Sequence, residues 1–150
     1  MSEIASAISS ERQILNLLAA YAFRNDDVDI AGLGDLFAKA VFMLDGAVAR
    51  GKGEIEAMAA AIIPVGPDGR STTSHEITNP SIEIDESAGR ATAQSYWTLY
   101  QEVPGTPRQA TMAGRYNDEF ALGEDRWEFT RREAIIRWRL DAPEAAEARA

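Results

Sequence analysis

The chain has 150 residues, of which 45% are apolar, and its formal net charge is −9. This length and apolar fraction predict one globular domain over residues 1–150 with a sizeable core rather than a disordered chain. The acidic balance argues against nucleic acid or an anionic membrane as a partner. A basic run at residues 131–139 alternates with apolar residues, which a strand with two faces explains better than a nucleic-acid patch.

Cysteine is absent, which excludes disulfides and thiol chemistry. With a single histidine as well, a zinc site is not expected, and we predict no metal and no cofactor. No apolar stretch approaches the roughly 20 residues that span a bilayer. The first residues lack the basic and apolar regions of a secretory signal, so we expect a cytoplasmic protein.

The first half of the chain predicts helices. Residues 10–24 form one, with Ser9 or Ser10 as N-cap, and its apolar face is made by Ile14, Leu17, Leu18, Tyr21 and Ala22. A second, short helix follows Asp29. Short strands are predicted at residues 41–44 and 48–50, and a break at residues 51–53 precedes a third helix at residues 54–63.

The second half predicts strands, at residues 72–85, 91–103, 109–122 and 127–140. Short turns join them, as in an antiparallel meander. Helices followed by a meander predict an α+β fold, in which about three helices cover one face of a strongly curved antiparallel sheet. Such a cone encloses a cavity suited to a small molecule. The expected core spans residues 11–141, followed by a frayed tail at residues 142–150.

Alternation along the strands predicts which side chains face the cavity. The inward sets are Ala91, Ala93, Ser95, Trp97 and Leu99 in one strand, Met112, Gly114 and Tyr116 in the next, and Arg132, Ala134, Ile136 and Trp138 in the last. Arg132 is then a cation among small and apolar neighbours, and a buried arginine normally needs a carboxylate partner. The alternative is that a β-bulge reverses the alternation and places Arg132 outside.

His75 is the only histidine, at the head of a predicted strand. Proton abstraction at neutral pH usually needs an imidazole or a tuned carboxylate, so histidine chemistry in this chain depends on this residue. A structural or surface role for His75 remains open. The loop after the first helix holds three acids, Asp26, Asp27 and Asp29. Either Asp27 or Asp29 is also suited to cap the second helix, so the residues alone do not choose among them.

Three motifs, taken in order, resemble a known family. The first motif is the run from Ile14 to Tyr21, followed by Asn25-Asp26 and residues 33–37. The second is the segment from Ser74 to Ile84. The third is Gly114 to Phe120, followed by Trp127-Glu128-Phe129 and Arg132. Together they resemble the SnoaL-like branch of the nuclear transport factor 2-like (NTF2-like) superfamily, over about residues 11–141. The resemblance implies the cone fold, which is also called cystatin-like.

Members of this branch include cofactor-free lyases, a dehydratase and a dehydrochlorinase, that use a His–Asp pair inside the cone. The resemblance therefore implies a catalytic pair of Asp26 and His75 with Arg132 nearby. The chain departs from these members. Asn25 stands where the dehydratase has a tyrosine, and the second histidine that the dehydratase uses is missing. Tyr21 stands where the dehydrochlorinase has a lysine. Neither specific activity is transferred. Cone folds of this type also imply a homodimer or homotrimer through the open sheet face.

These observations predict a cofactor-independent lyase or isomerase that acts on a small apolar or cyclic molecule. His75 and Asp26 are the expected catalytic residues, and the expected ligand contacts are Tyr21, Asn25, Trp97, Met112, Tyr116, Arg132 and Ile136. Tyr116, Asn25 or Arg132 would stabilise developing negative charge. The alternatives are a non-catalytic domain that binds a small ligand in the same cavity, and a subunit of a larger assembly.

Overall fold

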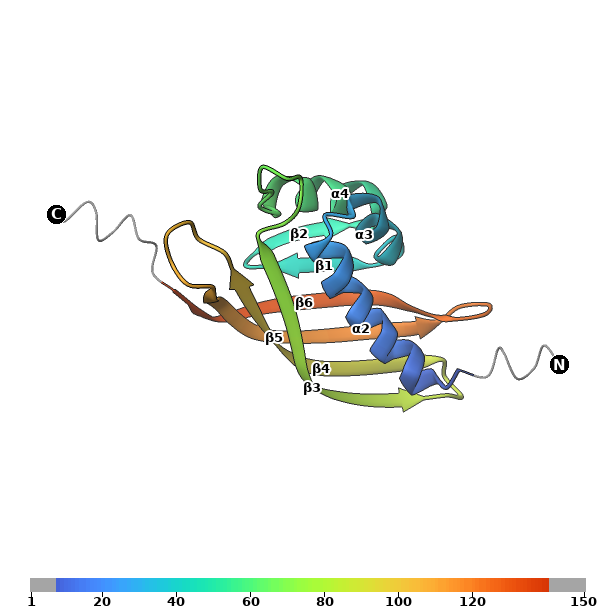
Figure 1. Cartoon of the computed structure of the whole chain (residues 1–150). Coiled ribbons are helices and arrows are strands. Elements are labelled where there is room, and N and C mark those ends of the chain that lie inside the picture. Colours follow the sequence, from blue (N-terminus) through green and yellow to red (C-terminus); the bar gives the residue numbers. More distant parts are fainter. Residues whose placement is uncertain (1–7, 141–150) are drawn as a thin grey trace.

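The computed structural model describes residues 8–140, in which three helices lie over one face of a six-stranded sheet (Figure 1). The helices are α2 (Ser10–Asp26), α3 (Ile30–Leu36) and α4 (Gly51–Ile62). The strands are β1 (Val41–Leu44), β2 (Ala47–Arg50), β3 (Thr73–Asp85), β4 (Arg90–Gln101), β5 (Gln109–Leu122) and β6 (Trp127–Arg139). The predicted α+β fold is confirmed. The predicted tail at residues 142–150 lies outside the described residues.

The sheet order is β2-β1-β6-β5-β4-β3. Strands β3 to β6 form the predicted antiparallel meander. The sheet as a whole is mixed, because β1 pairs with β6 in parallel, with Phe42 opposite Arg132. Hairpins force successive meander strands to alternate in direction, whereas β1 reaches the free edge of β6 after two helices and is under no such constraint.

Two helix boundaries differ from the predicted ones. Helix α2 continues to Asp26, two residues beyond the predicted end, and α4 begins at Gly51 rather than at Glu54. The Glu54 side chain accepts a hydrogen bond from the backbone N–H of Arg50 at 3.1 Å, which satisfies a donor at the start of the helix. With that donor satisfied, the predicted break at residues 51–53 becomes the first turn of α4.

Burial in the central strands follows the predicted alternation. In β4 the buried residues are Ala91, Ala93, Ser95 and Trp97, and in β5 they are Gly114, Tyr116, Asp118 and Phe120. These side chains face the helices and form the core with Ile14 and Leu18 of α2 and with Phe37. The inner face is therefore apolar over most of its area, which makes its few polar members informative.

Two β-bulges interrupt the alternation in β6. Glu119 pairs with Arg131 and Phe120 with Phe129, so Thr130 is the extra residue, and both Phe129 and Arg132 are buried. Gly114 pairs with Ile136 and Ala113 with Trp138, so Arg137 is a second extra residue. The prediction that Trp138 faces the cavity is wrong, since its side chain is 46% exposed. A bulge exchanges the two faces of the strand beyond it.

Gly114 leaves no room for a side chain. A Cβ atom there would overlap the carbonyl oxygen of Ile135 and lie 2.9 Å from the Trp97 ring. We expect Gly114→Ala to lower the free energy of unfolding by about 2–3 kcal/mol, because backbone cannot yield as a flexible side chain can. Gly53→Ala in α4 is the control, since a Cβ there meets nothing within 4 Å. Chemical denaturation checks both, and an equal effect on stability would contradict the argument.

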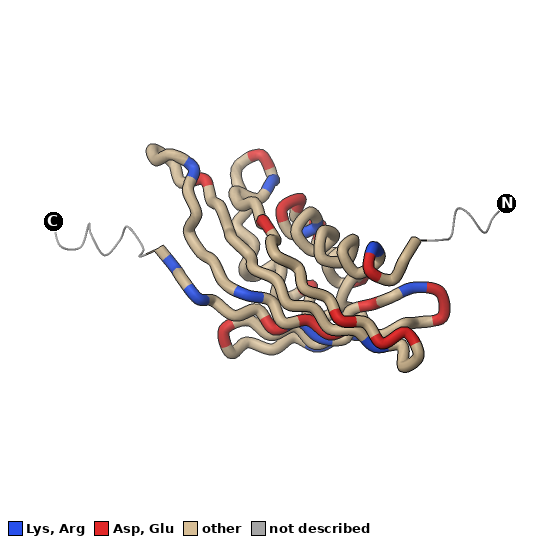
Figure 2. Tube along the Cα trace, turned by 90° about the horizontal axis from the view of Figure 1, so that it is seen from below, with Lys and Arg blue, Asp and Glu red and all other residues tan. Residues whose placement is uncertain are grey.

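Charged residues are interleaved on the surface. Figure 2 shows acidic and basic residues following one another along the strands, and Arg131 lies 3.6 Å from Glu119. The basic run of β6 is thus divided between two faces, with Arg131 outside and Arg132 buried. Over residues 8–140, no helix combines the length and apolar character needed to cross a membrane.

Candidate active site

A cavity of about 400 Å³ opens at the end of the molecule where β3 begins and β6 ends. The meander, α2, the hairpin of β1 and β2, and the end of α4 with the residues after it supply the lining. The lining residues are Tyr21, Asn25, Thr73, His75, Trp97, Leu99, Met112, Tyr116, Ala134, Ile136 and Arg139, with Leu44, Asp45, Ala47, Ile62, Ile63 and Pro64. The lining is largely apolar with few polar groups, as in most small-molecule sites.

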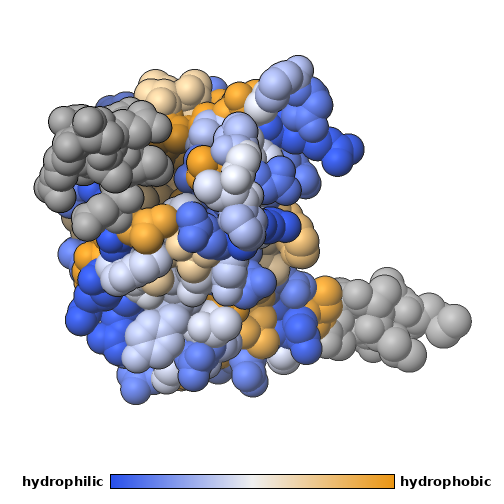
Figure 3. Space-filling view, turned by 60° about the vertical axis from the view of Figure 1, so that its left-hand side comes forward, coloured by the Kyte–Doolittle hydropathy of each residue, from blue (hydrophilic) through white to orange (hydrophobic). Residues whose placement is uncertain are grey.

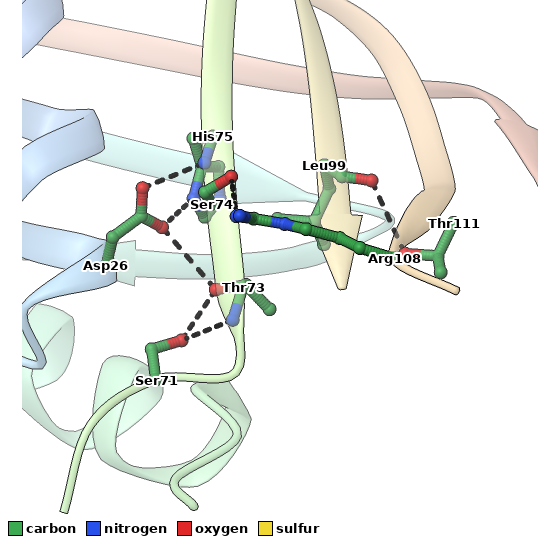
Figure 4. Close-up of polar contacts among 8 residues, drawn as sticks. All are labelled: Asp26, Ser71, Thr73, Ser74, His75, Leu99, Arg108 and Thr111. Carbon is green, nitrogen blue, oxygen red and sulfur yellow. Dashed lines mark hydrogen bonds and ion pairs between the residues drawn. The ribbon is translucent and has the colours of Figure 1, made fainter. Parts of the chain in front are cut away.

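Asp26 holds His75 through two hydrogen bonds (Figure 4). One carboxylate oxygen lies 2.7 Å from the imidazole Nδ1, and the other accepts from the backbone N–H of His75 at 2.8 Å. The Thr73 hydroxyl donates to the same carboxylate at 3.4 Å. A carboxylate accepts hydrogen bonds, so the contact favours the tautomer with its proton on Nδ1 and leaves Nε2 as a base.

Local structure explains why these two residues meet. Strand β3 is an edge of the sheet, so the N–H of His75 is not taken by a neighbouring strand on that side. Asp26 is the last residue of α2, which packs along β3, and its carboxylate satisfies this edge N–H. A negative charge at a helix C-terminus is unfavourable for the helix itself, so helix stability does not account for an acid at this position.

The open choice among the three acids is decided by geometry. Asp29 is the N-cap of α3 and accepts from the N–H of Gly32 at 2.9 Å, and Asp27 is exposed at the end of α2. Only Asp26 among them contacts His75. His75 lines the cavity, whereas Asp26 does not. Among the described residues no group hydrogen-bonds to Nε2.

Three buried polar side chains lie beside His75 in the cavity wall. The Tyr21 ring lies edge-on to two other rings, with its centroid 5.7 Å from that of His75 and 5.6 Å from that of Tyr116. Asn25 lies one helical turn after Tyr21 and is buried as well. Burial raises the pKa of Tyr21 above its ordinary value and raises that of Tyr116 further, against the opposing effect of the Arg132 charge. Both phenols therefore remain hydrogen-bond donors at neutral pH.

Arg132 lies behind this wall and not in it. Its guanidinium is fully buried, binds both carboxylate oxygens of Asp118 at 2.8 and 2.9 Å, and lies 3.7 Å from the centre of the Tyr116 ring. Arg132 is not among the residues that line the cavity, and its guanidinium lies over the rings of Tyr21 and Tyr116, which do line it, so a ligand contact of Arg132 stays a prediction. The Arg132 side chain points inward as expected. A β-bulge does occur nearby, at Thr130, but it does not turn Arg132 to the outer face.

Asp118 and Arg139 are two charged residues that the sequence analysis missed. Asp118 follows Tyr116 by two residues in β5, so the two side chains lie on the same face of the strand. Alternation could therefore have predicted Asp118 as the carboxylate partner that a buried Arg132 requires. Arg139 reaches the cavity only because of the second bulge in β6, and alternation alone placed it outside. The remaining expected contacts, Tyr21, Asn25, Trp97, Met112, Tyr116 and Ile136, all line the cavity.

A metal site is not formed in the described part of the chain. Within residues 8–140, no group of three or more His, Cys, Asp or Glu side chains is placed to hold an ion. The cavity residues that are described include one histidine in contact with a carboxylate and several buried donors, which suit proton transfer and hydrogen bonding.

Solved structures share this fold. An NTF2-like protein with a cystatin-like fold from Novosphingobium aromaticivorans is 23% identical, with 93% of this chain and 87% of that one covered and a TM-score of 0.71. A putative scytalone dehydratase from the same organism is 20% identical, with 88% and 87% covered and a TM-score of 0.70. A hexachlorocyclohexane dehydrochlorinase of type 2 is 17% identical, with 86% of each chain covered and a TM-score of 0.71. At these identities the likeness shows the fold alone.

A search of curated proteins gives no match. The family model described as the SnoaL-like domain matches residues 6–133, which is most of the chain and includes Asp26, His75 and the buried pair of Asp118 and Arg132. The chain belongs to the SnoaL-like family, with the NTF2-like, cystatin-like fold.

Proposed function

We propose that this protein is a cofactor-independent lyase or isomerase that abstracts a proton from a small apolar or cyclic molecule. One observation carries the proposal. Asp26 engages both Nδ1 and the backbone N–H of His75, while Nε2 has no hydrogen-bond partner among the described residues of a largely apolar cavity. An imidazole held in this way is positioned as a general base.

In the proposed step, Nε2 of His75 takes a proton from an acidic C–H. The electron pair of that bond then forms a C=C bond as a leaving group departs with its own pair, or it moves onto an adjacent carbonyl oxygen. In the second case the proton returns at another carbon. Asp26 stabilises the imidazolium without accepting its proton, and positioned acid–base catalysis of this kind contributes roughly 10²–10⁴-fold.

Negative charge develops on the oxygen or the leaving group, and the cavity offers donors for it. Tyr21, Tyr116 and Asn25 line the wall beside His75. Donors that are fixed by packing before the reaction stabilise developing charge at little reorganisation cost. Arg132 acts on this group from behind, because its charge lies against the faces of both tyrosine rings and makes their hydroxyl groups better donors.

The names of two similar structures support the reaction class. One is named as a putative dehydratase and the other as a dehydrochlorinase, names that each denote removal of a small leaving group, and both share the fold of this chain. The differences at Tyr21 and Asn25 noted in the sequence argue that the substrate is not the one of either protein. Loss of a proton next to a leaving group or a carbonyl is the part of the chemistry that the pair of Asp26 and His75 supports.

The proposal is tested by hydrogen–deuterium exchange at carbon. A pool of small cyclic ketones, phenols and halocarbons is incubated with the protein in D₂O, and deuterium incorporation or product formation is followed by mass spectrometry. Exchange or turnover is expected with the native protein and is expected to fall at least about 10²-fold in His75→Ala. The control is Glu76→Gln, an exposed neighbour in β3, which is expected to retain activity.

Two other outcomes are informative. Full activity in His75→Ala would contradict the proposal. A compound that binds equally well to the native protein and to His75→Ala, with no change after long incubation, would support the alternative of a ligand-binding domain.

A further inference from the structure

Arg139 ends a row of side chains that crosses the sheet at the cavity. His75 of β3 pairs with Leu99 of β4, Leu99 pairs with Met112 of β5, and Met112 pairs with Arg139 of β6. All four line the cavity. The proposed base therefore lies at one end of the row, a cation lies at the other, and two apolar side chains lie between them.

The second bulge of β6 creates this arrangement. Without the extra residue Arg137, the strict alternation of β6 would place Trp138 beside Met112 and turn Arg139 outward. The bulge instead exposes an aromatic side chain and places a cation, itself more than half exposed, at the mouth of a largely apolar cavity. An exposed tryptophan is unfavourable for folding alone, and the bulge that exposes it also brings a cation to the cavity, which points to a ligand role for Arg139.

Arg139 is free to engage a ligand. Its only described ionic partner is Asp45, across the cavity mouth in the turn between β1 and β2, at 3.8 Å. Both side chains are more than half exposed, so solvent screens this pair and a ligand can displace it. No other Lys or Arg side chain among the described residues lines the cavity. Figure 3 brings this end of the molecule forward and shows small apolar groups set among hydrophilic ones.

We infer that the ligand is an apolar or cyclic carboxylate, whose anionic group binds Arg139 while its reacting carbon lies at His75. The inference deepens the proposed function and rests on it for the position of the reacting end. Arg recognises a carboxylate through two parallel N–H donors, which fixes orientation as well as charge. Leu99 and Met112, with Trp97 beside them, contact the apolar body between the two ends.

The length of the row limits the size of the ligand. Neighbouring strands lie about 4.8 Å apart, so the Cα atoms of His75 and Arg139 are separated by roughly 14 Å at most across three spacings. Both side chains line the cavity and occupy part of this span. The remaining space fits one ring or a short chain between a reacting carbon and a carboxylate.

The test compares each carboxylate with its neutral amide. The probes are 3-phenylpropanoate with 3-phenylpropanamide, and cyclohexanecarboxylate with cyclohexanecarboxamide, titrated into the protein and followed by ¹H–¹⁵N NMR. We expect the native protein to bind at least one carboxylate about five- to tenfold more tightly than its amide, and we expect this preference to shrink at high salt. If no carboxylate binds better than its amide, including the case in which none binds, the inference is overturned.

Three variants identify the residue responsible. Arg139→Gln is expected to abolish the preference, and Arg137→Gln, an exposed arginine of the same strand that does not line the cavity, is expected to keep it. Asp45→Asn is expected to tighten carboxylate binding, because it removes the competing acid. A preference that persists in Arg139→Gln, or that is lost equally in Arg137→Gln, would overturn the assignment.

This test is separable from that of the proposed function. His75→Ala is expected to keep the preference for carboxylates although it loses proton transfer, since Arg139 and His75 lie at opposite ends of the row. Failure of the deuterium-exchange experiment alone would leave a carboxylate-binding cavity. Failure of the titrations alone would leave a general base whose substrate lacks the anionic group.

Discussion

Asp26→Asn is expected to lower the rate of proton abstraction by roughly 10²–10⁴-fold while leaving ligand binding almost unchanged. The amide group of asparagine donates to Nδ1 as readily as it accepts, so the imidazole adopts the other tautomer and Nε2 carries the proton. The imidazolium formed in the reaction also loses its carboxylate. The edge N–H of His75 keeps an acceptor, because the amide oxygen can replace the carboxylate oxygen now 2.8 Å away.

Single-turnover kinetics and ligand titration measure the two effects separately. Asp27→Asn is the matched control, since it removes the same charge from the next residue, which is exposed and does not contact His75. An equal loss of rate in both variants would show that general electrostatics, and not the contact with His75, is responsible. A loss of binding without a loss of rate in Asp26→Asn would assign Asp26 a structural role.

Arg132→Met is expected to lower the free energy of unfolding by about 3–5 kcal/mol, because it leaves the buried carboxylate of Asp118 without its partner. Both side chains of this pair are completely buried, and their two hydrogen bonds of 2.8 and 2.9 Å are the only ones described for that carboxylate. The variant also removes the cation from between the Tyr21, Tyr116 and Phe129 rings. Chemical denaturation with a two-state analysis measures the loss.

The double variant Arg132→Met/Asp118→Leu separates the two causes. Replacing a buried ion pair by apolar residues of similar size is often neutral, so most of the lost stability is expected to return. Arg131→Gln is the control, since its ion pair with Glu119 is on the surface at 3.6 Å and its loss is expected to cost less than about 0.5 kcal/mol. A double variant no more stable than Arg132→Met would mean that ring stacking, and not the carboxylate, dominates.

The pH dependence of Arg132→Met follows from burial of Asp118. Burial raises the pKa of Asp118, and Arg132 opposes that rise in the native protein. Without Arg132 the rise is larger, and the folded state binds a proton that the unfolded state has lost. Stability therefore falls as the pH increases through the raised pKa, and the deficit of the variant is expected to be smaller in mildly acidic solution than at neutral pH.

Several features of this protein follow from local sequence. Helical spacing of apolar residues predicted α2, and the alternation of β4 predicted that Ala91, Ala93, Ser95 and Trp97 are buried. Turn residues separated the long strands of the meander. These features depend on neighbours a few residues apart, where side-chain periodicity alone decides which face is apolar. The order of the three motifs then pointed to the family.

The tertiary structure decided which charged residues meet. The residues alone left Asp26 as one of three candidate acids, and the family resemblance pointed to it. Packing of α2 along the edge strand brings it to His75, 49 positions away in the chain. Asp118 became the partner of Arg132, and Arg139 replaced Trp138 at the cavity, because two bulges changed the register of β6 against β5. Register is set by hydrogen bonds between distant strands, and a shift of one residue turns a side chain to the other face. The sequence by itself therefore determined the layers and most of the apolar wall, and the packing of α2 together with the pairing of strands determined the charged residues placed beside it.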